Sequence, residues 1–130
     1  MHRTAVLLHT LPSGESHFDW LIDQPAAEYE HRLLSWRCAQ NPAGGLDFRG
    51  ELLPDHRAVY LDFEGSISGN RGYVQRIASG FVQSIMQGPN TLDLTIQWAN
   101  SLVHYTGHRE DQDRNQWGFA ATIIKTMLDE

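Results

Sequence analysis

The sequence of 130 residues contains a single cysteine, Cys38, so the chain cannot form an internal disulfide. Proteins without disulfides are typical of reducing compartments, and we expect an intracellular, cytoplasmic protein. Cys38 is expected to be a small core residue, the alternative being a nucleophile. Long apolar runs are also absent. The longest one near the N-terminus covers residues 5–8, too short for a signal peptide or a membrane span.

Basic residues are scarce as well. Ten Lys and Arg stand against sixteen Asp and Glu, which gives a formal net charge of −6 at pH 7. Affinity for a phosphate backbone comes mostly from Lys and Arg, so this composition disfavours a general nucleic-acid-binding protein. A local basic face remains open around Arg49, Arg57, Arg71 and Arg76. With 41% hydrophobic residues, the sequence predicts one globular domain over residues 1–130.

The sequence is rich in short alternating segments separated by turn residues. Strands are expected at residues 3–9, 17–23, 31–38, 48–53, 73–77, 81–86, 92–98, 102–106 and 117–125. A hairpin turn is expected at residues 78–80, and a charged loop at residues 107–115. Because no long amphipathic segment occurs, the predicted fold is all-β. We expect a single antiparallel β-barrel of about eight strands with short helical turns, a sandwich being the alternative.

Polar and apolar side chains alternate over residues 17–23, so His17 and Asp19 share one face of the expected strand. His9 ends the preceding strand. If the two strands pair as a hairpin across residues 11–16, His9 lies near His17 and Asp19. Two imidazoles and one carboxylate suit Mn²⁺, Zn²⁺ or Fe²⁺. The pattern predicts a divalent metal site, the alternative being ordinary surface or core residues.

Residues 55–60 show no alternation, and Asp55 is a suitable cap for a single helical turn. In such a turn His56 and Tyr60, four residues apart, would share a face. That pair can hold a phosphate or move a proton. The alternative is a capped turn with Tyr60 packed in the core.

Several of these segments, in this order, resemble one family. They are His9, residues 17–20, residues 34–36, residues 55–65 and residues 68–72. The sequence is similar to the 3′-phosphoesterase domain of bacterial DNA ligase D, the end-healing module of non-homologous end joining. That family carries an H…HxDxR motif, a strand ending in SW and a DHPxxYxDFEG segment. The resemblance covers roughly residues 4–82, with a fainter echo at 117–125, and residues 55–65 are its most specific part.

The resemblance implies a compact β-barrel with a manganese ion held by His9, His17 and Asp19. It also implies that His56 and Tyr60 contact a 3′-terminal phosphate. The family trims a 3′ ribonucleotide and removes the remaining 3′ phosphate during DNA repair. The expected partner is therefore a nucleic acid 3′ end or a smaller phosphoester, with no role for a membrane. We expect a stand-alone relative without ligase and polymerase domains. Residues 62–65 are expected to be architectural, with Phe63 plugging the barrel.

The sequence departs from the family motif at one position. The family has an Arg two residues after the Asp, where it grips phosphate, and this sequence has Leu21. An apolar side chain cannot provide the forked, charged hydrogen bonds of Arg. Arg57 and Arg71 are the candidate replacements, each with the alternative of a solvated surface residue. Since Leu21 shares a strand face with Asp19, it is expected to border the pocket, and Leu21→Arg to raise turnover.

Two functions follow from the sequence. The first is a metal-dependent phosphoesterase that uses His56 and Tyr60, with His56, Arg57 and Arg71 binding phosphate. The second is a catalytically degenerate relative that binds a metal ion, an anion or a protein partner on the same barrel.

Overall fold

A computed structural model describes residues 2–23, 32–57 and 61–127, and nearly all of it is β-strand. The strands are β1 (His2–Thr10), β2 (Ser16–Asp23), β3 (Arg32–Cys38), β4 (Phe48–Arg57), β5 (Gly65–Ser66), β6 (Tyr73–Gln87), β7 (Thr91–Trp98), β8 (Ser101–Asp111) and β9 (Gln116–Thr126). One short 3₁₀ turn, η1 (Pro42–Gly44), follows β3. None of the described segments is a helix long and apolar enough to cross a membrane.

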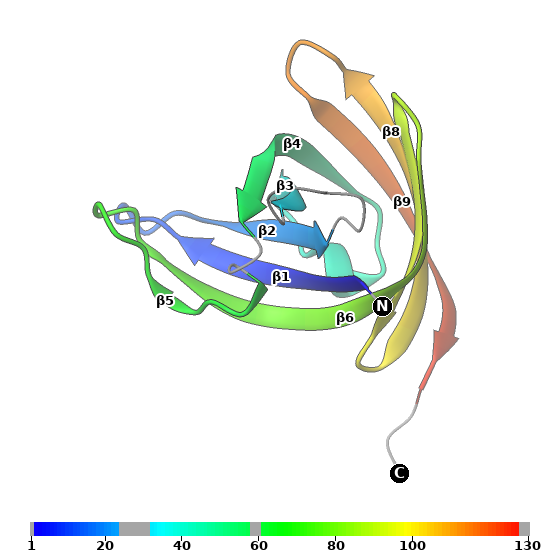
Figure 1. The fold of residues 1–130 in the computed structure, drawn as a ribbon, viewed down its shortest axis with the longest axis horizontal. Helices are drawn as coiled ribbons and strands as arrows, with labels where there is room; N and C mark the ends of the chain where they lie inside the picture. The colour runs from blue at the N-terminus through cyan, green and yellow to red at the C-terminus, as the bar shows by residue number, and fades with distance from the viewer. Residues whose placement is uncertain (1, 24–31, 58–60, 128–130) are drawn as a thin grey trace.

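Eight of the strands form a closed antiparallel barrel. Their order is β1, β2, β3, β4, β9, β8, β7 and β6, and β6 pairs with β1 to close the ring. Figure 1 shows β1 and β6 side by side, with β8 and β9 forming the wall at the right. The short β5 pairs with the first residues of β6. The predicted single antiparallel β-barrel with short helical turns is confirmed.

Three local predictions are wrong. Residues 73–87 form one strand of 15 residues instead of two strands joined at a turn. Gly80 is needed there because a Cβ atom would lie 2.5 Å from the Gln97 carbonyl oxygen on the neighbouring strand. Residues 107–111 extend β8 instead of starting a loop. Residues 55–57 end β4 instead of opening a helical turn, and Tyr60 lies outside the described residues.

The main core fills the barrel and contains all four tryptophans, each no more than 5% exposed. Trp20 lies at its centre, with the rings of Trp36, Phe48, Tyr105 and Phe119 between 5.0 and 5.7 Å from its own ring centre. All four tryptophans are therefore core residues. Burial raises the pKa of the Cys38 thiol to about 12, with a smaller contribution from the Asp19 charge. Cys38 is therefore a protonated core residue.

A second apolar cluster lies on the opposite face of the sheet. Val6 belongs to the main core, whereas Ala5 and Leu7, its neighbours on β1, belong to the second cluster. Residues 61–67, which we call the strap, cover this outer face. Leu61 is buried in the second cluster and Phe63 packs against it. Phe63 therefore covers the outside of the barrel, and the expectation that it plugs the interior is wrong.

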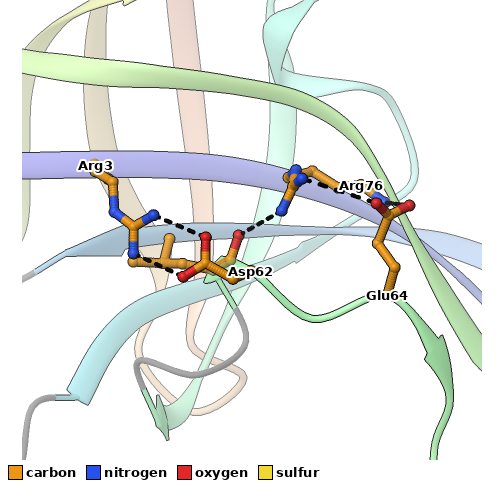
Figure 2. Close-up of polar contacts among 5 residues, drawn as sticks. Arg3, Asp62, Glu64 and Arg76 are labelled. Atoms are coloured by element: carbon orange, nitrogen blue, oxygen red, sulfur yellow. Dashed lines mark hydrogen bonds and ion pairs between the residues drawn. The ribbon is translucent and has the colours of Figure 1, made fainter.

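Ion pairs and main-chain contacts fasten the strap to the barrel (Figure 2). Arg3 donates two hydrogen bonds to the Asp62 carboxylate, at 2.8 and 3.1 Å. Arg76 donates to the Leu61 carbonyl oxygen at 3.1 Å, and its main-chain N–H donates to Glu64. The architectural role expected for residues 62–65 agrees with these contacts.

Candidate metal centre

The β1–β2 hairpin places His9 directly opposite His17, and Leu7 opposite Asp19. Leu11 and Glu15 close the turn between the strands through a main-chain hydrogen bond of 2.8 Å. The predicted hairpin is confirmed. Because Leu7 faces the second cluster, His9 two residues later lies on that same outer face, together with His17 and Asp19.

The three side chains converge on one another. Asp19 Oδ1 lies 3.2 Å from His17 Nε2, and Asp19 Oδ2 lies 3.6 Å from His9 Nδ1. One candidate ligand atom from each residue can be chosen so that all three lie within 4.8 Å of one another. The side chains of His9, His17 and Asp19 are 14%, 13% and 10% exposed. The cluster is thus shielded from bulk water but still reachable from it.

The hydrogen bonds of His9 determine which of its nitrogens can bind a cation. His9 Nε2 lies 2.8 Å from the Arg71 carbonyl oxygen. A carbonyl can only accept, so Nε2 carries the proton, and a neutral His9 presents the Nδ1 lone pair to Asp19. A ring nitrogen that donates to a main-chain carbonyl while the other faces an ion is a common arrangement of metal-binding histidines.

His17 and Asp19 are close to each other but are not hydrogen-bonded. His17 Nε2 and Asp19 Oδ1 are close enough to count as an ion pair, yet both atoms are buried and neither makes a hydrogen bond. A distance of 3.2 Å does not make a hydrogen bond when the donor and acceptor are not aligned. By contrast, His104 Nε2 and Asp93 Oδ1 form an ordinary hydrogen-bonded pair at 2.9 Å.

The Arg71 carbonyl reaches His9 because the chain turns tightly before β6. The Ile67 N–H donates to the Gly72 carbonyl oxygen at 2.8 Å, which closes the turn. Gly72 has a φ of +88°, and a Cβ atom there would lie 1.9 Å from the Thr10 carbonyl oxygen. Only glycine fits this position. In Figure 1 this turn lies beside the β1–β2 turn, at the left edge of the molecule.

Arg71 thus contacts the metal centre through its main-chain carbonyl group, which accepts the hydrogen bond from His9. Its guanidinium donates to Ser68 instead, at 2.7 Å to the carbonyl oxygen and 3.3 Å to Oγ. The side chain remains exposed, and its predicted contact with phosphate stays a prediction.

The other predicted phosphate ligands lie elsewhere on the sheet or outside the described residues. The His56 main chain pairs with Leu33, and Leu33 pairs with Asp23 on β2. Asp23 lies four residues beyond Asp19, about 13 Å along the strand. The side chains of His56 and Arg57, and all of Tyr60, lie outside the described part of the chain. Their roles stay predictions.

Leu21 shares the face of Asp19, as expected, but it does not border an open pocket. Its side chain is 0% exposed and packs in the second cluster with Leu33 and Leu61. The strap therefore closes the outer face at this position. An Arg here would have to bury its charge.

Arg37 is a candidate residue that the sequence reasoning missed. It lies directly opposite Asp19 on β3, on the outer face, because its neighbours Trp36 and Cys38 face the main core. Directly opposite residues in a sheet have Cβ atoms about 4.5–5.5 Å apart. Arg37 is exposed and makes no ion pair or hydrogen bond with any described residue. The strand predicted at residues 31–38 could have indicated the direction of this side chain, but not its partner on β2.

Comparison with models of known families and with curated proteins returns no match. Two imidazoles and one carboxylate leave coordination positions open on an ion of Mn²⁺, Zn²⁺ or Fe²⁺. The donor set fits such an ion, because His9 can bind it through Nδ1 and because His17 Nε2 and Asp19 Oδ1 have no other hydrogen-bond partner. The adjacent Arg37 adds a positive charge that can bind an anionic oxygen.

Proposed function

We propose that the protein is a metal-dependent phosphoesterase whose divalent ion is held by His9, His17 and Asp19. The observation that carries the proposal is the convergence of three ligand atoms without a hydrogen bond between His17 and Asp19. Manganese is the proposed ion, with zinc or iron as alternatives. The proposed substrate is a 3′-phosphate at a nucleic acid end or a smaller phosphoester, by resemblance to the end-healing domain of DNA ligase D.

The residues of the centre have separate roles in this proposal. A bound divalent ion would polarise a phosphoryl oxygen and lower the pKa of a coordinated water. The Arg71 carbonyl fixes the tautomer and orientation of His9. Arg37 binds a non-bridging phosphate oxygen beside Asp19, in place of the Arg that the family motif carries at Leu21. His56 and Tyr60, with Arg57, are proposed to contact the 3′-phosphate on the strength of the resemblance alone.

The second candidate is a metal- or anion-binding protein without catalytic activity. The observation that favours it is the complete burial of Leu21, which leaves the motif position without a charged group. The net charge of −6 also gives little support for general DNA binding.

The test is phosphate release from a DNA primer with a 3′-phosphate, measured with and without added Mn²⁺. We expect release that requires the ion and falls on the order of 100-fold or more in His17→Ala. His104→Ala is the matched control, because it removes a histidine that is already paired with Asp93. Loss of a charged donor to the phosphate in Arg37→Gln should lower the rate by roughly 30- to 1000-fold.

A second substrate separates the two candidates. If the wild type binds Mn²⁺ at the centre but releases phosphate neither from the primer nor from p-nitrophenyl phosphate, the binding-protein alternative is correct. If phosphate release is equal in wild type and His17→Ala, the metal centre is not the active site.

A further inference from the structure

The turn at residues 67–72 joins β5 to β6 and reaches the metal centre from a different hairpin. β5 pairs with the first two residues of β6, and β1 pairs with the same two residues through His9 and Thr10. The turn therefore begins where the strap ends and lies beside the end of β1. Its Arg71 carbonyl oxygen lies 2.8 Å from His9 Nε2. The orientation of one candidate metal ligand thus depends on the shape of this turn.

Hydrogen bonds, and not apolar packing, hold the tip of this turn in shape. Residues 68–71 are all exposed. Gly69, Asn70 and Gly72 have φ angles of +78°, +55° and +88°, and asparagine tolerates positive φ better than most residues other than glycine. The Arg71 guanidinium bridges the turn, donating from Nε to the Ser68 carbonyl oxygen at 2.7 Å and from a terminal nitrogen to Ser68 Oγ at 3.3 Å. Arg71 thus fastens the turn that carries its own carbonyl group.

We propose that Arg71 is a positioning residue of the metal centre, and that it acts through the turn. Its side chain holds the turn, and the turn presents the Arg71 carbonyl to His9. The carbonyl accepts the Nε2 hydrogen, so that Nδ1 is the nitrogen left to bind an ion. Loss of such an outer partner of a metal-binding histidine typically lowers metal affinity about 10- to 100-fold. The proposal rests on the metal site of the proposed function, but not on its phosphoester substrate.

The sign of the effect on metal binding separates this role from an effect of charge. The main chain of Arg71 contacts His9, so its guanidinium places a positive charge near the centre. Like charges repel, so if this charge alone mattered, its removal would strengthen the binding of a divalent cation. If Arg71 instead holds the turn, its removal should weaken binding, because His9 then loses its fixed acceptor.

The first test is the affinity of the full chain for Mn²⁺, measured by electron paramagnetic resonance of the free ion. Arg71→Ala should weaken binding on the order of 10- to 100-fold. Ser68→Ala, which removes only the weaker acceptor, should weaken it less. Arg114→Ala is the matched control and should bind as the wild type does. Arg114 also contacts the residue three before it, Asp111, but in the β8–β9 turn at the top of Figure 1, away from the centre.

The second test reads the tautomer of His9 by ¹⁵N NMR of the metal-free protein, at a pH where the ring is neutral. The wild type should carry the proton on Nε2, because the Arg71 carbonyl accepts it there. Arg71→Ala should show both tautomers, since the turn no longer holds the acceptor in place. Far-ultraviolet circular dichroism should be the same in all variants, because residues 68–71 are exposed and their loss of contacts leaves the barrel intact.

Two outcomes would overturn the proposal. One is Mn²⁺ binding in Arg71→Ala that is as tight as in the wild type or tighter. The other is a single Nε2 tautomer of His9 in that variant. A wild type that binds no Mn²⁺ would contradict the proposed function instead, and the tautomer would then decide by itself whether Arg71 positions His9.

Discussion

Two histidine–aspartate pairs of the barrel, His17–Asp19 at the metal centre and His104–Asp93, differ in their hydrogen bonding. His17 Nε2 and Asp19 Oδ1 lie 3.2 Å apart, and both are buried without a hydrogen bond. His104 Nε2 and Asp93 Oδ1 form a hydrogen bond of 2.9 Å on the exposed surface. The difference agrees with the cation that we propose at the first pair.

The two faces of the sheet can be compared at consecutive residues of β3. Trp36 faces the main core, while Arg37 faces outward beside Asp19. The alternation of the strand thus separates the packing of the barrel from the residues of the metal centre.

The largest expected effect on stability comes from substitution of Leu21, which lies two residues from Asp19 of the metal centre. Leu21→Arg should lower the free energy of unfolding by about 3 kcal/mol or more, because a charge would be buried among apolar side chains. Leu21→Met, which conserves volume, should cost less than about 1.5 kcal/mol. Urea denaturation measures both. A stable Leu21→Arg protein with raised turnover would show that this position opens to the metal centre, as the sequence suggested.

A smaller effect should distinguish the tryptophan Trp98, whose N–H is hydrogen-bonded, from Trp117, whose buried N–H has no partner. Trp98→Phe and Trp117→Phe remove the same atoms, but only Trp98 loses a hydrogen bond, the one to the Tyr105 hydroxyl. Trp98→Phe should therefore destabilise the protein by about 1 kcal/mol more. Equal losses in urea denaturation would mean that the Trp117 N–H is satisfied as well as that of Trp98.

The smallest expected effect on stability is that of the Arg3–Asp62 ion pair, which fastens the strap to the outer face. The Arg3 guanidinium holds the pKa of Asp62 below its ordinary value, chiefly through their hydrogen bonds. The folded pKa is therefore the lower one, and the pair stabilises the fold above the unfolded value of about 3.9. This contribution is lost as the pH falls through the folded pKa, in the window below about pH 4. Because Asp62 is exposed, the change is small.

Denaturation of Asp62→Asn between pH 2 and pH 7 tests whether the stabilisation by the Arg3–Asp62 pair is lost in acid. The variant should be slightly less stable than wild type at pH 7, and the gap should close in acid. Asp113→Asn, which removes a carboxylate without an arginine partner among the described residues, should show no such convergence. A gap that widens in acid would contradict the assigned role of Arg3.

The sequence predicts best what depends on neighbouring residues. Alternation over residues 17–23 and the turn at 11–16 were sufficient to place His9, His17 and Asp19 together. The closed barrel followed from many short alternating segments. The extended β6 was missed because Gly80, a turn residue in isolation, instead permits close approach of the next strand.

Contacts between distant segments could not be read from the sequence. The position of Arg37 beside Asp19 depends on the register between β2 and β3. The burial of Leu21 depends on the strap, forty residues further along the chain. The absence of a partner for the buried N–H groups of Trp36 and Trp117 depends on packing between strands that are far apart in the sequence. Tertiary packing sets each of these features, and local pattern does not encode them.

The binding of one divalent ion by His9, His17 and Asp19 is tested most directly by an anomalous difference map from crystals grown with Mn²⁺. We expect one strong peak within bonding distance of His9 Nδ1, His17 Nε2 and the Asp19 carboxylate, and no such peak in His17→Ala crystals. A map without a peak at this position, or with the peak unchanged in His17→Ala, would contradict the assignment.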